Sequence, residues 1–322
     1  MKFKNLFDCL LWYAVLGLGC DGLAQEAGVM AVQAPGLVGL RIQGEPFLTF
    51  NHSPGLAKPY FHPLRAPGGH VVTSLAPFDH KHHKGIWIGV EHVNGWNFWG
   101  GKYQQQDVVD GQPAAERIHN EQVEVHPLPH GAQQLAIVNI WQGKEGRPVI
   151  REETRVNAYP DRLLIFEIHL RAMEPEVRFD DTKEGFFAVR VAPTMIGRLE
   201  GRIVNAEGLV GEKDCWGKPS AWVDYSGPVD GKLVGIALFD HPANFRPSRY
   251  HVRDYGLFAI SPFGEKVYSK GAAEAAPITL KQGEALRLVY GLFTHQGDEK
   301  GGKVAETYQR FLERSAGLKS LE

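Results

Sequence analysis

The stretch "RLLIFEIHL", residues 162–170, has an apolar side chain at every second position from Leu164 to Leu170, with Glu167 and His169 between them. A period of two residues is that of a β-strand, whose successive side chains point to opposite faces of a sheet. Three further stretches alternate in a similar way: "ERIHNEQVEVH" (116–126), "QQLAIVNIW" (133–141) and "ALRLVYGLF" (285–293). We therefore predict that all four are strands with one buried face.

A hairpin is predicted between residues 85 and 100. "GIWIGVEHV" (85–93) is followed by Asn94-Gly95 and then by "WNFWG" (96–100). Asn-Gly is the dipeptide that best suits the two-residue type I′ turn. We expect four aromatic side chains of this hairpin to border a pocket or the core beside it: Trp87, Trp96, Phe98 and Trp99.

Only the last segment of the chain has a convincing helical period. In "GKVAETYQRFLERSAG" (302–317), one apolar stripe is formed by Val304, Tyr308, Phe311 and Leu312. The 322 residues include 37 glycines and 20 prolines, as expected of many short strands joined by turns, and no Gly/Ser linker divides them. The sequence therefore predicts an all-β fold: a large, supersandwich-like two-sheet β-sandwich with a C-terminal α-helix, forming a single domain over residues 25–322.

Residues 1–24 have the order of an export signal. "MKFKNLF" supplies positive charge, "CLLWYAVLGLG" is a short apolar core, and "GLA" precedes Gln25. A lipoprotein signal ending at Cys20 is the alternative, so a lipid anchor at Cys20 stays open. The apolar run is too short to span a bilayer, and no transmembrane span is expected in the mature chain. We expect a periplasmic or extracellular protein with at most Cys20 and Cys215, which implies no disulfide framework.

The charge balance bears on the partner. The chain has 35 basic and 37 acidic residues, so no polybasic face predicts nucleic-acid binding. The expected partner is a small molecule or an oligosaccharide.

The stretch "DHKHHKG", residues 79–85, concentrates ionisable side chains just before the apolar run "IWIGV". If strand geometry begins by residue 80, His80 and His82 project from one face and His83 from the other. Three interpretations stay open: histidines for acid–base chemistry or substrate binding, a metal site at His80 and His82, or a polar loop bonded to backbone or to Asp79.

Two later stretches have a similar density of ionisable groups. "FDDTKEGFFAVRVAP" (179–193) places Glu184 before an apolar strand that carries Arg190, which is either solvated or reaches a buried acid. "DHPANFRPSRYHVRDYGLFAISPFG" (240–264) combines His251, Arg253 and neighbouring acids with tyrosines. Aromatic rings beside charged groups are typical of a sugar site.

Together, the motifs "DHKHHKGIW" (79–87), "DDTKEGFFAVRVAP" (180–193), "AWVDYSG" (221–227) and "HVRDYGLFA" (251–259) resemble a secreted bacterial family labelled "methane oxygenase PmoA". The resemblance covers roughly residues 30–315, with Lys81 where proline is common and Lys84 where arginine is common. It implies carbohydrate catabolism and a fold similar to galactose mutarotase. It does not imply a genuine methane monooxygenase subunit, which is a multi-helix membrane protein.

These observations predict an exported carbohydrate-active enzyme of epimerase, lyase or hydrolase type, since unperturbed histidine titrates near neutral pH and can transfer protons. A non-catalytic carbohydrate-binding protein and a histidine-ligated metal enzyme are the alternatives. No cofactor is predicted, and a divalent metal would bind at His80 and His82. The predicted catalytic residues are His80, His82, Glu184 and His251. The predicted substrate-binding residues are His83, Arg190, Arg253, Asp254, Trp87 and Tyr250. We expect these side chains to converge on one cleft.

Overall fold

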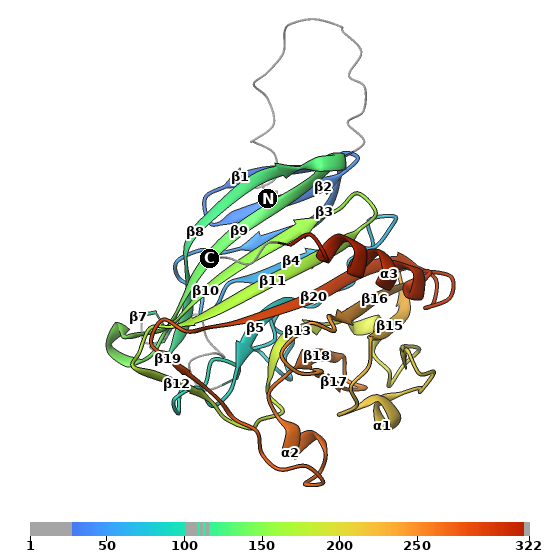
Figure 1. The fold of residues 1–322 in the computed structure, drawn as a ribbon. Coiled ribbons are helices and arrows are strands. Elements are labelled where there is room, and N and C mark those ends of the chain that lie inside the picture. Colours follow the sequence, from blue (N-terminus) through green and yellow to red (C-terminus); the bar gives the residue numbers. More distant parts are fainter. Residues whose placement is uncertain (1–27, 101–107, 110–111, 114–115, 319–322) are drawn as a thin grey trace, which may run out of the picture.

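Two eight-stranded antiparallel sheets dominate the computed structural model, which describes residues 28–100, 108–109, 112–113 and 116–318 (Figure 1). The first sheet has the order β1 (Val29–Ala34), β2 (Leu37–Ile42), β3 (Glu45–Asn51), β4 (Tyr60–Leu64), β5 (Ile86–Val90), β13 (Gly185–Arg190), β18 (Leu257–Ser261) and β17 (Arg249–Val252). The second has the order β14 (Arg202–Asn205), β15 (Trp222–Val229), β16 (Lys232–Asp240), β20 (Ala285–Gln296), β11 (Leu163–Ala172), β10 (Pro148–Ala158), β9 (Ala132–Gln142) and β8 (Arg117–Leu128).

The remaining elements are short, with one exception. Two small strand pairs are β12 (Glu176–Phe179) with β19 (Ile278–Lys281), and β6 (Val108–Val109) with β7 (Gln112–Pro113). The helices are α1 (Glu212–Cys215), α2 (Glu265–Tyr268) and the longer α3 (Val304–Ser315). None of the helices within the described residues has the length and apolarity that a membrane crossing requires.

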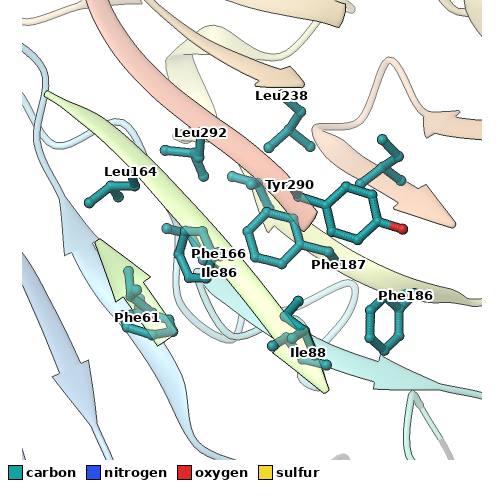
Figure 2. Close-up of a cluster of buried hydrophobic side chains, with 14 of the residues drawn as sticks. Phe61, Ile86, Ile88, Leu164, Phe166, Phe186, Phe187, Leu238, Tyr290 and Leu292 are labelled. Atoms are coloured by element: carbon teal, nitrogen blue, oxygen red, sulfur yellow. The ribbon is translucent and has the colours of Figure 1, made fainter. Parts of the chain in front are cut away.

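The main core lies between the two sheets. Phe166 of β11 is in edge contact with Phe61 of β4, with ring centroids 5.4 Å apart, and lies 4.7 Å from Phe187 of β13 (Figure 2). All three rings are less than 5% exposed. Each large apolar side chain buried in this way contributes about 1.5–3 kcal/mol relative to its exposed state. The predicted two-sheet sandwich is confirmed.

The C-terminal helix α3 covers the outer face of the second sheet, as its predicted apolar stripe suggests. Val304 and Phe311 are buried there against Ile165 and Phe239. Consequently β11 is buried on both faces. Its alternation predicts only one buried face, and that prediction is wrong. The physical reason lies in the near-continuous apolar run, which is typical of a strand covered on both sides.

The predicted turn at Asn94-Gly95 is confirmed, but the second strand of the hairpin is not. Both residues have positive φ (49° and 77°), as a type I′ turn requires, and Val93 pairs with Trp96. Residues 97–100 then leave the ladder. Asn97 Oδ1 accepts the backbone N–H groups of Trp99 (3.0 Å) and Gly100 (2.9 Å), which gives the chain an alternative to strand pairing.

Candidate active site

The candidate site lies on the outer face of the first sheet, away from the main core. The strand registers place Trp87, Ala188, Ala259 and His251 in one row across β5, β13, β18 and β17. Because neighbouring strands lie about 4.8 Å apart, two small alanines separate the two large side chains. Trp87, both alanines and Trp99 form an apolar cluster distinct from the inter-sheet core.

A cavity of about 280 Å³ opens beside this cluster. Four segments of the chain contribute to it: the loop before β5, the segment after β5, the residue just before β13 and the turn between β17 and β18. Its lining residues are His80, His82, His83, Glu91, Asn97, Trp99, Gly100, Glu184 and Tyr255. Its size is near the lower end of the range of small-molecule sites, about 300–1,000 Å³.

A column of four stacked rings stands at the cavity, and three of them, Tyr255, His80 and His83, line it. Tyr255 stacks on His80 at 4.8 Å, His80 on His83 at 4.7 Å, and His83 on Trp87 at 5.0 Å. His82 stands edge-on to both His80 and His83. The expected strand alternation of these histidines is wrong, because turns at residues 78–79 and 81–82 carry them and β5 begins only at Ile86. The turns gather all three imidazoles on the cavity side.

Arg190 fixes this wall from β13. Its Nη2 donates to both carboxylate oxygens of Asp79, at 3.1 and 2.9 Å. Its Nη1 lies 3.1 Å from Nδ1 of His83. A guanidinium group can only donate, so His83 Nδ1 accepts and a neutral His83 carries its proton on Nε2. Asp79 also lies 3.0 Å from Nδ1 of His80, so one carboxylate connects the arginine to that imidazole.

Burial keeps most of these imidazoles neutral. It lowers the pKa of His82 to about 3, assisted by the charge of Lys58. Burial and the neighbouring His82 and Arg190 also lower the pKa of His83. Burial lowers the pKa of His251 to about 4. Our expectation that catalytic histidines titrate near neutral pH does not hold for His82 and His251, since desolvation disfavours their charged form.

Asp79 has a lowered pKa. Burial raises the pKa of its carboxyl group, but the hydrogen bonds from Arg190 and the nearby His80 outweigh burial and hold that pKa below its ordinary value. Asp79 is therefore ionised at neutral pH and compensates the charge of the buried guanidinium.

Two carboxylates, Glu184 and Glu91, also line the cavity. Glu184, just before β13, is about one quarter exposed and accepts a hydrogen bond from Lys183 Nζ. Glu91 is held by Thr182 Oγ1 (3.0 Å) and by Asn97 Nδ2 (3.2 Å). The backbone N–H of Glu91 donates to the carbonyl of Glu184 at 2.9 Å. The two acidic residues thus lie side by side on adjacent strand ends.

His251 lies behind Glu184 and not in the cavity lining. Its ring is 2% exposed, and its Nδ1 donates to the carbonyl of Lys183 at 2.9 Å. The carboxylate of Glu184 acts on its pKa in the upward direction, against burial. The structure therefore places His251 near the predicted carboxylate, but as a buried neighbour.

Arg253 and Asp254 lie at the border of the site. Arg253 Nη1 donates to Glu212 of α1 at 2.8 Å, and the other oxygen of Glu212 accepts the backbone N–H of Asp254 at 2.7 Å. The Arg253 guanidinium lies 5.9 Å from the centroid of the Tyr255 ring. Neither residue is part of the cavity lining, so their contact with the cavity passes through Tyr255.

Tyr250 and Trp87, two aromatic residues predicted to bind substrate, do not line the cavity. Tyr250 is fully buried in the main core, where its hydroxyl donates to the Leu238 carbonyl at 3.0 Å. Its neighbour His251 faces outward, because successive residues of β17 point to opposite faces. Trp87 is 1% exposed beneath His83. It supports the ring column from below and leaves no face for a ligand.

Sequence reasoning missed Glu91 and Asn97 as lining residues, and it placed Tyr255 among the aromatics bordering a pocket without giving it a substrate-binding role. Tyr255 is also flanked by the guanidinium groups of Arg190 (5.1 Å) and Arg198 (5.8 Å). The signal for Tyr255 was present in "HVRDYG", since a turn residue after an outward-facing strand end belongs to the same face. Glu91 and Asn97 flank the predicted turn, and nothing in their spacing indicated that the chain folds back on the cavity.

The alternative interpretation, a metal site at His80 and His82, has no complete ligand set in the part of the chain that the structure describes. There, no group of three or more histidine, cysteine, aspartate or glutamate side chains is arranged to hold a metal ion. Cys215, the cysteine that lies in this part, is buried, and burial raises the pKa of its thiol to about 11. It is therefore a thiol and no nucleophile at neutral pH.

A family model described as "Family of unknown function (DUF6807)" matches residues 38–309. No curated protein matches the chain in sequence. Among solved structures, a putative aldose 1-epimerase from Klebsiella pneumoniae is similar with a TM-score of 0.42 and 10% identity, over 88% of this chain and 84% of that one. A GalM/aldose epimerase homologue from C. elegans has a TM-score of 0.35 and 9% identity, over 84% of this chain and 99% of that one.

The GH36 α-galactosidase AgaA from Geobacillus stearothermophilus is similar with a TM-score of 0.41 and 8% identity, over 85% of this chain. The match spans only 41% of that enzyme's length. Likenesses this low in identity and TM-score say nothing about activity. The fold of the present chain is established by its own two sheets.

Proposed function

The chain belongs to the family of unknown function DUF6807, and we propose that it is an exported enzyme that acts on a sugar or glycoside by acid–base catalysis. The observation that carries the proposal is the cavity itself. It combines two carboxylates, three imidazoles, an amide and two aromatic rings in a space near the lower end of the small-molecule range. Aromatic faces and converging polar groups are what a hydroxyl-rich ring requires.

Glu184 and His80 are the proposed proton-transfer groups. Both line the cavity, and the Lys183 ammonium beside Glu184 compensates the charge of a carboxylate there. The Asp79 carboxylate lies 3.0 Å from Nδ1 of His80, so its negative charge is beside that imidazole. One of these two groups can accept a proton from the substrate while the other supplies one.

The remaining imidazoles are proposed to bind and polarise the substrate. His83 offers its Nε2–H as a donor, because its Nδ1 accepts from Arg190. A neutral imidazole donor stabilises negative charge that develops on a substrate oxygen without adding a full charge to the ground state. Arg190 therefore acts through His83 and Asp79 as a positioning residue.

These groups suit reactions that begin with proton transfer at a sugar carbon or oxygen, namely epimerisation, elimination or hydrolysis. Methane chemistry has no place in the proposal, since the supporting groups are proton carriers and hydrogen-bond donors.

Incubation of the protein with a panel of mono- and disaccharides in D₂O, followed by ¹H NMR, tests the proposal. Loss of a C–H signal, new epimer signals, olefinic signals or free reducing ends each identify one reaction class. The proposal expects one of these changes, dependent on protein concentration. Saturation-transfer signals from a bound sugar without any chemical change would contradict it and would favour a carbohydrate-binding protein.

A further inference from the structure

A second cavity, here called the basic pocket, lies between α1 and α2 and has a volume of about 390 Å³. Figure 1 shows both short helices at the end of the molecule that also carries β17 and β18. The basic pocket shares no lining residue with the candidate active site.

Its lining is strongly cationic. Lys213, Lys218, Lys270 and Arg249 contribute four positive charges, against one negative charge from Asp214. The whole chain has a net charge of −2, so this concentration of positive charge is local. Arg249 is paired with Glu265 at 2.9 Å, while the three lysines are exposed. An anion is the ligand that this lining favours.

The walls of the basic pocket are fixed by hydrogen bonds. The backbone N–H of Gly217 donates to the Tyr250 carbonyl at 2.8 Å, and its own carbonyl accepts from Arg249 Nη1 at 3.0 Å. Gly217 has a φ of 72°, and a Cβ there would lie 2.7 Å from the carbonyl oxygen of Tyr268. The two walls therefore approach as closely as glycine permits.

Two aromatic side chains connect the basic pocket to the candidate active site. Trp216 and Tyr268 line it, and their rings lie 6.0 and 6.1 Å from that of His251. The Tyr268 hydroxyl donates to the Lys183 carbonyl at 2.7 Å, the same carbonyl that His251 Nδ1 contacts. Lys183 directly precedes Glu184, so one backbone segment separates the two cavities.

We propose that the basic pocket is a second subsite that binds the anionic group, a carboxylate or a sulfate ester, of a carbohydrate ligand. The lysines supply the charge and Trp216 supplies an aromatic wall for the sugar ring. The carbohydrate part of this inference rests on the proposed function. The anionic part rests on the lining of the basic pocket alone.

Isothermal titration with four probes tests the inference: D-glucuronate, D-glucose 6-sulfate, D-glucose and inorganic sulfate. We expect both charged sugars to bind at least about tenfold more tightly than D-glucose or sulfate, and to weaken as salt screens the lysines. A Lys213→Gln, Lys270→Gln double variant should lose that preference. Lys266→Gln is the matched control, because Lys266 is an exposed lysine of α2 outside the lining, and it should retain the preference.

Three results would overturn the inference: equal affinity for D-glucose and the charged sugars, sulfate binding as tightly as the charged sugars, or an unchanged preference in the double variant. Titration of Glu184→Gln separates this inference from the proposed function. Charge-dependent sugar binding by a protein that shows no turnover would support the basic pocket and contradict the proposed catalysis. Turnover of neutral sugars without any preference for charged sugars would support the proposed catalysis and contradict the basic pocket.

Discussion

At the scale of single residues, the site depends on imidazoles that stay neutral. His83 accepts from Arg190 at 3.1 Å, and burial holds its pKa below the ordinary value. A buried histidine that stays neutral in the folded state lowers the free energy of unfolding at any pH at which the unfolded chain would protonate it. The stability of this protein therefore depends on pH through the same groups that form its candidate site.

We predict that the free energy of unfolding falls as the pH is lowered from about 6.5 toward 4. His82 has a folded pKa of about 3, against an ordinary value of 6.5. In this window the unfolded state binds the proton and the folded state does not, so stability rises with pH and is lost on acidification. Urea unfolding monitored by fluorescence at several pH values measures the slope.

The variant His82→Asn should reduce this slope by up to one proton, because asparagine does not titrate. His130→Asn is the control, since His130 is an exposed loop residue, and it should leave the slope unchanged. An identical slope in wild type and His82→Asn would contradict the assignment of His82 as a buried neutral imidazole.

The density of ionisable residues in "DHKHHKG" indicated the correct region but not the directions of its side chains. Strand alternation would have separated His83 from His80, whereas successive turns stack their rings at 4.7 Å. The bonds that decide this come from Arg190, more than a hundred residues away in the chain. Local sequence patterns contain no information about such a distant partner.

At the scale of elements, the alternation of β17 divides neighbouring residues between the core and the site. Tyr250 faces inward and His251 outward, opposite Ile260 and Ala259 of β18, respectively. The strand itself is too short for a periodicity argument, with four residues from Arg249 to Val252. Its pairing register, which the sequence does not contain, decides which side chain reaches the site.

Tyr250→Phe should therefore act on stability and not on activity. Loss of the hydrogen bond to the Leu238 carbonyl, 3.0 Å long, should lower the free energy of unfolding by about 1 kcal/mol. Ligand affinity and turnover should stay within about twofold of wild type, because Tyr250 lies on the other face of the sheet. Chemical denaturation and the NMR assay measure the two effects. Loss of binding with unchanged stability would show that Tyr250 contacts the ligand.

At the scale of the whole molecule, the sequence predicts the fold class better than the site. The alternating stretches identified β8, β9, β11 and β20, and all four belong to the second sheet. The first sheet, which carries the site, has shorter strands, and β13 is inserted between β5 and β18. Such non-local neighbours follow from the packing of the whole chain and leave no local signature.

One core joins the two sheets, with members from Val29 of β1 to Leu292 of β20. We predict that the chain unfolds in one cooperative transition, as expected of the single domain proposed over residues 25–322. Far-UV circular dichroism and tryptophan fluorescence should give coincident denaturation curves. Two separated transitions would contradict the single domain.

Export is a separate proposal, supported by the order of charged, apolar and small residues in residues 1–24, which lie outside the described residues. We predict that the mature protein begins at Gln25 or at a lipidated Cys20. Intact-mass spectrometry of the protein purified from its native cells measures this. A cytoplasmic protein with an intact Met1 terminus would contradict export.

The most direct test of the central claim is the turnover rate of Glu184→Gln in the D₂O NMR assay, compared with wild type and with Glu207→Gln. Glutamine keeps the size of the Glu184 side chain but cannot exchange a proton, and Glu207 is exposed and outside the cavity lining. We predict a loss of about a hundredfold or more for Glu184→Gln with unchanged stability, and wild-type turnover for Glu207→Gln. Wild-type turnover by Glu184→Gln would contradict acid–base catalysis at this cavity.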